Sequence, residues 1–161
     1  MFSEDSHRDS CGTGILFSKN NTFSHSILKR SIASLQCMRH RGALSYDGKT
    51  PDGVGIMTDL DHNFFQKKLL DEQNLILPSR FGLGMFFVNK KFPFLENLKV
   101  ILDEHELYLI AVRELKFDES ILGEMAKKSC PRILQIFVEN KKRTDSNDQL
   151  DVNLYKAKKL F

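Results

Sequence analysis

Short apolar segments alternate along this chain, some with strand-like and some with helix-like spacing, and this alternation constrains the fold most strongly. Turn residues bound the strand-like segments, and the helix-like segments place apolar residues three or four positions apart. Strands are predicted at 14–18, 54–58, 81–89, 107–115 and 132–138. Helices are predicted at 24–40, 62–73, 93–105, 121–128 and 150–161. Taken alone, strands that alternate with helices favour a parallel α/β sheet.

Cap and turn residues delimit several of these elements. Ser24 suits the N-cap of the first helix, and Gly42 suits the C′ position after it. Ser120 is the predicted N-cap of the fourth helix. Residues 43–52 are rich in Asp, Gly, Ser and Pro, which predicts a loop. The polar residues 139–149 predict a linker before the last helix.

A Gly-x-Gly pattern recurs at three of the predicted strands, in CGTGILF, DGVGIMT and FGLGMFF. Glycines two apart on a strand lie on the same face, where they allow a close approach of another backbone or a ligand, or simply tight packing at the start of the strand. None of the three continues as GxGxxG into a helix, and the chain has no GKS or GKT. The pattern is therefore not typical of a phosphate-binding loop.

Composition excludes several classes of function. The chain has 161 residues, enough for one domain with a real core, and a formal net charge of +3 with its basic residues spread along the sequence. That distribution argues against nucleic-acid binding. Its apolar runs are too short to span a membrane. The spacing of its histidines and cysteines matches no structural zinc motif, so no metal site is predicted.

The cysteines and the N-terminal residues indicate the cellular compartment of the protein. Three cysteines at wide spacing argue against a disulfide framework and for a reducing compartment. Residues 1–10 are polar and contain no apolar targeting segment. The predicted location is cytoplasmic.

Cys11 leads directly into the first predicted strand and has two interpretations. A free thiol has a pKa of about 8.5 and needs a helper to react at neutral pH. If the ten preceding residues are removed, the α-amino group of Cys11 can act as its base, with an ordinary pKa of about 7.7–8.0. The alternative is a small buried residue without chemistry.

The segments CGTGILF and LQCMRHRGALSYDGKTPDGVGI resemble the start of the glutamine amidotransferase domain of the glutamate synthase large subunit. In that family a Cys-Gly-Val-Gly strand precedes a helix, a His-Arg-Gly-Ala segment and a glycine-rich Asp-Gly-Lys-Thr loop. FGLGMFFVN, LGEMAKKSCPRILQIFVEN and DVNLYKAKKLF resemble later family segments in the same order. His-Arg-Gly is shared by other class II amidotransferases, whereas Asp47–Thr50 and Leu122–Val138 favour glutamate synthase.

The resemblance implies an α+β fold, the four-layer αββα sandwich of N-terminal-nucleophile hydrolases, with only its first part present. It implies that residues 1–10 are a propeptide-like leader and that 11–161 are a partial amidotransferase domain of type 2. Cys11 would attack the side-chain amide of the substrate L-glutamine and release ammonia. FMN and an iron–sulfur cluster are implied only for the complete enzyme, and no cofactor is implied in this chain. The implied partner is the remainder of glutamate synthase, in cis or in trans.

Beside the catalytic Cys11, a supporting loop near the nucleophile is predicted. Arg41 either lies near the nucleophile or binds the last helix carbonyls. His40 is expected to make a structural hydrogen bond, and Asp52 to order the loop. Cys37 and Cys130 are expected to be packed, inert thiols. The supporting residues are His40, Arg41, Gly42, Asp52 and Gly53.

The chain also departs from the family, which leaves enzymatic activity open. Pro51 replaces a family glycine, and Val54 replaces an alanine. The family segments RFSTN, which helps to hold the glutamine carboxylate, and HNGE, which forms the oxyanion hole, do not occur. Loss of one oxyanion-hole donor costs about 10²–10³ in rate. The chain is therefore either an enzyme part that needs the remainder, or a non-catalytic relic or interaction module that keeps the fold.

Overall fold

The computed structural model describes residues 12–20, 24–89, 92–142 and 147–160, which fall into two compact units. Unit 1 comprises the described residues of 1–59 and 119–128, and unit 2 those of 60–118 and 129–161. No helix among the described residues is long and apolar enough to cross a bilayer.

Unit 2 is built on one three-stranded sheet of β1 (Gly82–Val88), β2 (Leu107–Leu115) and β3 (Arg132–Asn140). The strand order is β1-β3-β2, and β3 is antiparallel to both neighbours. The parallel sheet that alternation alone favoured is therefore wrong. The last strand enters between the first two, so β1 and β2 run parallel to each other without sharing a hydrogen bond.

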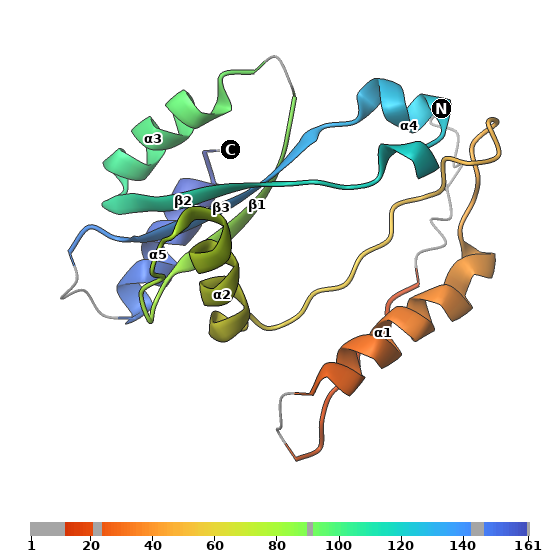
Figure 1. Cartoon of the computed structure of the whole chain (residues 1–161), viewed down its shortest axis with the longest axis horizontal. Coiled ribbons are helices and arrows are strands. Elements are labelled where there is room, and N and C mark those ends of the chain that lie inside the picture. The colour runs from red at the N-terminus through yellow and green to blue at the C-terminus, as the bar shows by residue number, and fades with distance from the viewer. Residues whose placement is uncertain (1–11, 21–23, 90–91, 143–146, 161) are drawn as a thin grey trace, which may run out of the picture. The chain divides into compact units, whose positions relative to one another are not determined.

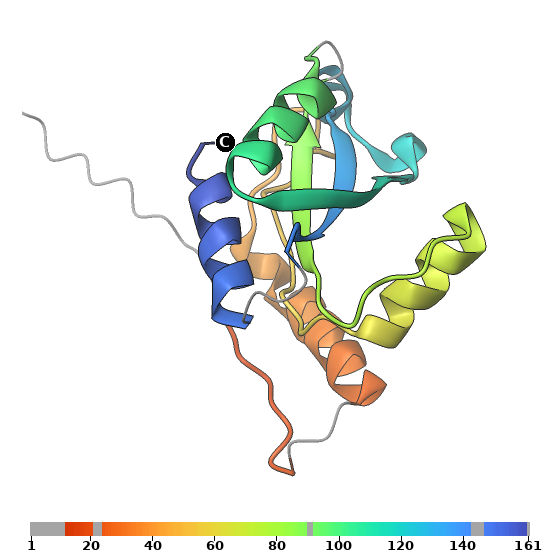
Figure 2. The same cartoon turned by 90° about the vertical axis from the view of Figure 1, so that its left-hand side faces the viewer.

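Three helices cover the sheet of unit 2. Figure 2 shows α3 (Phe94–Glu104) and α5 (Asn147–Lys158) on one side of the strands and α2 (His62–Gln73) on the other. β3 is buried on both faces, as expected for a central strand between helical layers. The mixed helix and sheet composition agrees with the α+β class. The described residues form a single sheet, so the two-sheet sandwich remains a proposal.

Two apolar clusters form the core of unit 2. Between α2 and the sheet, Phe137 is fully buried and meets the rings of Phe65 and Phe81 at centroid distances of 5.6 and 5.9 Å. The cluster beneath α3 and α5 contains Val88, Phe94, Leu98, Leu102, Leu107, Leu134, Ile136, Val138, Leu150 and Ala157.

Local capping explains the bounds of α2, which are those predicted from the sequence. The Asp61 carboxylate accepts hydrogen bonds from the N–H groups of Asn63 at 2.9 Å and Phe64 at 3.3 Å, which satisfies the first turn. The helix ends at Asn74, whose φ of 54° is the left-handed conformation that stops a helix.

One glycine of the FGLGMFF strand permits close packing of a helix. A Cβ on Gly82 would lie 2.6 Å from Cδ2 of Leu154 and 3.0 Å from Cγ2 of Val138. The side chain of Leu154 on α5 therefore occupies the space that a larger residue in β1 would need. This agrees with the tight packing that the Gly-x-Gly spacing also allowed.

Unit 1 contains α1 (His25–Cys37), η1 (Met38–Arg41), η2 (Glu119–Ile121) and α4 (Glu124–Ser129), of which the last residue is assigned to unit 2 (Figure 1). Ser24 is the N-cap of α1, as predicted, and its hydroxyl accepts from the N–H of Ser26 at 3.2 Å. The predicted C′ role of Gly42 is wrong. A 3₁₀ turn follows the α-helix, and Gly42 leaves it in an extended conformation with φ −92° and ψ 147°.

The predicted strands 14–18 and 54–58 do not form among the described residues. Their side chains are exposed: Ile15 by 86%, Phe17 by 82% and Val54 by 74%. A strand needs a neighbour for its backbone groups, and the described part of unit 1 supplies none beyond one isolated bridge.

The remaining differences are at element boundaries. Ser120 lies inside η2 and is not the N-cap of α4, so that prediction is wrong. The strand predicted at 132–138 extends to Asn140, which shortens the linker. The last helix begins at Asn147 and ends at Lys158. Helix α3 spans 94–104, within one residue of its predicted bounds at each end.

Candidate functional site

The predicted nucleophile, Cys11, lies outside the described residues, but its neighbour Gly12 is described. A Cβ on Gly12 would lie 3.2 Å from Sδ of Met38 and 3.4 Å from Cδ of Arg41. The backbone that follows Cys11 therefore passes the η1 turn, against the stem of the Arg41 side chain. A guanidinium in this place supplies positive charge beside the first residues of the segment.

The η1 turn presents His40 and Arg41 in succession. Nδ1 of His40 lies 3.0 Å from the carbonyl oxygen of Cys37, a hydrogen bond that holds the ring on the last turn of α1. Among the described residues, no hydrogen bond joins the Arg41 guanidinium to a carbonyl of α1. The geometry thus gives His40 a local structural contact and places the stem of the Arg41 side chain beside Gly12.

Residues 43–52 form a narrow loop after η1. The N–H of Ala43 donates to Oδ2 of Asp52 at 2.8 Å, and the N–H of Asp52 donates to the carbonyl of Ala43 at 3.1 Å. Farther along, the N–H of Ser45 donates to the carbonyl of Thr50 at 2.8 Å. Asp52 therefore ties the two ends of the loop together. Gly53, the next residue, is exposed and meets no neighbour that would exclude a side chain.

Pro51 fits this loop even though it replaces a family glycine. It faces Leu44 in an isolated antiparallel bridge, at a point where the loop hydrogen bonds come from its neighbours. The sharp turn falls instead at Gly48, whose φ of +64° suits glycine. The loop thus keeps its turn without a glycine at position 51.

Asp47 organises the tip of the loop. Its Oδ1 accepts from the N–H groups of Lys49 at 3.0 Å and Thr50 at 2.8 Å. Its Oδ2 accepts from the Thr50 hydroxyl at 2.6 Å and from the N–H of Met125 at 3.4 Å. The Thr50 hydroxyl first, and then these backbone donors, hold the pKa of Asp47 well below its usual range. Asp47 is therefore a carboxylate at neutral pH.

Sequence reasoning missed the contact between Asp47 and the start of α4. Asp-Gly in a loop predicts a turn, but no sequence signal pairs it with residues almost eighty positions later. A Cβ on Gly123 would overlap Oδ2 of Asp47 and Oγ1 of Thr50, so a larger residue there would have to displace these two side-chain oxygens. Asp47, Thr50, Gly123 and Met125 are called the Asp47 cluster below.

The two described cysteines differ in exposure. Cys37 is exposed at the end of α1 in unit 1, whereas Cys130 is half-buried in unit 2, and neither forms a disulfide. The expectation that Cys37 is packed is therefore wrong, since helix α1 has no buried residue. No group of three or more His, Cys, Asp or Glu within the described ranges is placed to hold a metal.

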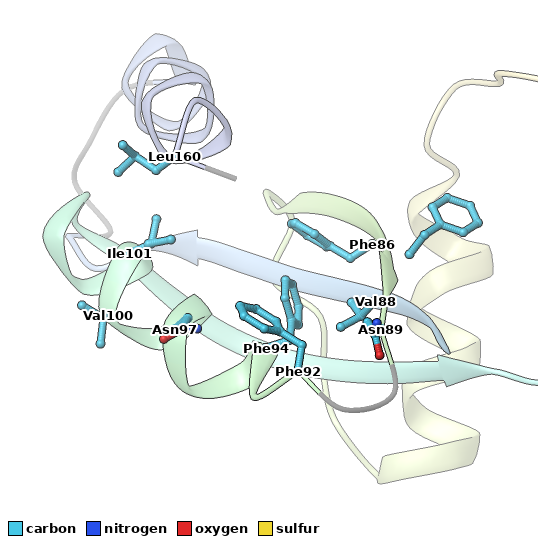
Figure 3. Close-up of a pocket in the computed structure, with 10 residues that line it drawn as sticks. Phe86, Val88, Asn89, Phe92, Phe94, Asn97, Val100, Ile101 and Leu160 are labelled. Carbon is cyan, nitrogen blue, oxygen red and sulfur yellow. The ribbon is translucent and has the colours of Figure 1, made fainter. Parts of the chain in front are cut away.

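Unit 2 carries an open apolar groove of about 820 Å³. Figure 3 shows Phe86, Phe92 and Phe94 between the end of β1 and α3. The rings of Phe86 and Phe94 lie 4.8 Å apart. None of the residues that line the groove is titratable or nucleophilic, so it offers no acid, base or nucleophile.

Comparison with known proteins places the chain in a family. Residues 11–161 match the family of class-II glutamine amidotransferases, and the chain belongs to that family. The match begins at Cys11.

Relatives point to one kind of enzyme within the family. The chain is 31% identical to ferredoxin-dependent glutamate synthase 1 of Arabidopsis thaliana over 97% of its length. It is 34% identical over 96% to the spinach (Spinacia oleracea) chloroplastic enzyme, and 30% identical over 96% to glutamate synthase 2 of Synechocystis. It spans 10% of the length of each of these relatives.

Proposed function

We propose that this chain is the nucleophile-bearing part of a glutamine amidotransferase domain of glutamate synthase. The observation that carries the proposal is the position of Arg41 against Gly12, directly after Cys11, in a family match that starts at Cys11 itself. A cation beside a cysteine favours the thiolate, which is the attacking species. The loop 43–52 follows η1 directly, and its internal hydrogen bonds help to fix the position of Arg41.

The proposed chemistry is hydrolysis of the glutamine side-chain amide. Removal of residues 1–10 exposes the α-amino group of Cys11, which takes the thiol proton. The thiolate attacks the amide carbon, the C–N bond breaks, and ammonia leaves with the proton returned from the amine. Water then cleaves the γ-glutamyl thioester and releases glutamate. The balance is glutamine and water to glutamate and ammonia.

Further residues are needed to complete this site. The motifs RFSTN and HNGE do not occur in the chain, so the carboxylate clamp and the oxyanion hole are proposed to come from the remainder of the enzyme, in cis or in trans. The exposed apolar segments 14–18 and 54–58 are proposed to become strands of the second sheet of the αββα sandwich in that context. The exposure of Ile15, Phe17 and Val54 supports this.

Cofactors of the complete enzyme are assigned elsewhere. The thiolates that hold an iron–sulfur cluster are commonly grouped within a few residues of one another, whereas the three cysteines of this chain, at 11, 37 and 130, are far apart in the sequence. The residues of this chain therefore do not fit a cluster. FMN and the cluster are proposed to lie in the remainder, and the proposed location is cytoplasmic, whereas several relatives are named as chloroplastic.

Two measurements test the proposal. The full chain is produced in cells, alone and together with the remaining amidotransferase segment of the Synechocystis relative, and its first residue is read by mass spectrometry. We expect Cys11 as the first residue, and labelling of Cys11 by a glutamine-like diazo-ketone when the remaining segment is present. Cys37→Ala is the matched control and should label normally, whereas Cys11→Ala should not.

The outcomes separate the two functions considered for this chain. Ammonia release from glutamine that depends on Cys11 supports the amidotransferase. An intact residue 1–10 leader together with an unlabelled Cys11, even with the remaining segment bound, identifies a non-catalytic relic or interaction module.

A further inference from the structure

We propose that Asp47 is a positioning residue for Cys11: its carboxylate fastens the loop 43–52 to the start of α4 and thereby holds Arg41 against the segment that follows Cys11. The inference rests on the proposed function, because it assigns Asp47 a role in preparing the same nucleophile. All the contacts that it uses lie within unit 1.

The first step is the attachment of the loop tip to α4. The Asp47 carboxylate accepts four hydrogen bonds, and the one from Met125 is the long-range member. The Tyr46 hydroxyl adds a second link to the same residue, with 3.1 Å from its oxygen to Sδ of Met125. The bare backbone of Gly123 lets the carboxylate approach this closely. The loop tip therefore has two attachments to the start of α4.

The second step connects the loop tip to its base. The paired bonds between Ala43 and Asp52, the Leu44 to Pro51 bridge and the bond from Ser45 to Thr50 connect the two sides of the loop at successive positions. A loop linked in this way moves as one piece. Displacement of its tip is then passed to Ala43, two residues from Arg41.

The third step is the contact of Arg41 with the nucleophile segment. The Arg41 stem lies against Gly12, where an added Cβ would be 3.4 Å from Cδ and 3.5 Å from Nε. A guanidinium held there favours ionisation of a neighbouring thiol. Release of the loop tip allows Arg41 to move away, and Cys11 then titrates as an ordinary thiol.

The test measures Cys11 in the full chain by its rate of reaction with iodoacetamide as a function of pH, read by peptide mass spectrometry. The exposed Cys37 in the same sample is the internal reference. Asp47→Asn replaces the acceptor Oδ2 or turns it away, and Thr50→Val removes the hydroxyl without changing side-chain size. Thr50→Ser keeps the hydroxyl, and Asp59→Asn, at an exposed carboxylate elsewhere in unit 1, is the charge-matched control.

We expect Asp47→Asn and Thr50→Val to move the midpoint of the Cys11 profile toward about 8.5, the value of an ordinary thiol. The rate at pH 7 should fall by about threefold or more, which corresponds to half a pKa unit or more. Thr50→Ser and Asp59→Asn should behave as the unsubstituted chain. Hydrogen exchange of residues 43–52 should become faster in the first two variants only.

An unchanged Cys11 profile in Thr50→Val overturns the proposal, whether or not exchange in the loop becomes faster, and circular dichroism verifies that the variant is folded. If Asp47→Asn does not fold, the comparison of the Cys11 profiles of Thr50→Val and Thr50→Ser still tests the proposal. Iodoacetamide reads the thiol without a glutamine site. A chain that never labels with the diazo-ketone but shows the Asp47 dependence therefore contradicts the proposed function and not this inference.

Discussion

Single side chains in this protein gain their roles from partners that lie far along the chain. The pKa of Asp47 lies well below its usual range because the Thr50 hydroxyl and several backbone N–H groups donate to its carboxylate, and one of these donors comes from α4. Phe137 is fully buried among aromatic rings, whereas Phe87, on the neighbouring strand, is 69% exposed. A phenylalanine side chain thus contributes more or less to the stability of the fold according to how deeply its position is buried.

The lowered pKa of Asp47 predicts loosening of the loop 43–52 in acid. A carboxylate whose folded pKa is depressed contributes stability that is present above its unfolded pKa of about 4 and is lost as the pH falls toward the folded value. The protection factors of the Lys49 and Thr50 amides should therefore decline below about pH 4. Measurement by NMR hydrogen exchange on wild type and Asp47→Asn tests this, since the variant should lack the pH-dependent step.

Phe137→Ala should destabilise the chain by about 3–5 kcal/mol, because it removes a fully buried ring and leaves a cavity beneath α2. Phe87→Ala makes the same chemical change at a mostly exposed ring and should alter stability by at most about 0.5 kcal/mol. Urea unfolding curves of both variants provide the comparison. Equal effects would contradict the assignment of the core to the β3 face under α2.

Helices and strands in unit 2 are held in place by close contacts between layers. Glu72 of α2 forms a two-pronged ion pair with Arg113 of β2, at 2.5 and 2.8 Å, and the hydrogen bonds from Arg113 lower the pKa of Glu72. On the other face, α5 approaches β1 over Gly82. Helix α2 is therefore joined to the sheet by an ion pair, and α5 by close packing over Gly82.

Gly82→Ala should weaken the attachment of α5 to β1. The added Cβ would lie within 3 Å of both Leu154 methyl carbons, and such overpacking costs about 1–3 kcal/mol. The double variant Gly82→Ala with Leu154→Ala should lose less free energy of unfolding than the two single variants lose together, because the second change removes the overlap. Gly55→Ala, in open space, is the control. A strictly additive cycle in urea unfolding would count against the close contact.

The two units of the chain differ in how much apolar surface they bury. Every buried hydrophobic residue in the described ranges belongs to unit 2. In the described part of unit 1 only Gly123 is buried, and α1 has no buried residue at all. Unit 1 nevertheless carries the loop, Arg41 and the segment after Cys11. The part proposed to do the chemistry is thus the part that obtains least stability from its own packing.

This difference predicts uneven hydrogen exchange in the isolated chain. The amides of β3 should be the slowest to exchange, because this central strand is buried on both faces. The amides of α1 should exchange faster by orders of magnitude, since its helix lacks a buried apolar face. Mass spectrometry of exchanged peptides gives the result. Equal protection of α1 and β3 would show that unit 1 is stabilised independently of buried apolar contacts.

Local sequence patterns were sufficient to predict an element wherever that element depends on its own periodicity and caps. The bounds of α2 and β2 are those predicted, and Ser24 caps α1. The family was also recognisable from short motifs around Cys11 and His40. Predictions failed at 14–18 and 54–58, for which the described residues supply no neighbouring strand, and at Gly42, which follows a 3₁₀ turn and not an α-helix.

Periodicity, capping and motifs are properties of neighbouring residues, and they were enough to predict the helices, three of the strands and the membership in class-II glutamine amidotransferases. The β1-β3-β2 order and the pairing of Asp47 with Gly123 and Met125 could be found only from the folded chain. Such contacts depend on how distant segments share backbone hydrogen bonds and space. A turn signal at Asp47 specifies a bend in the chain but not the residue that will meet it.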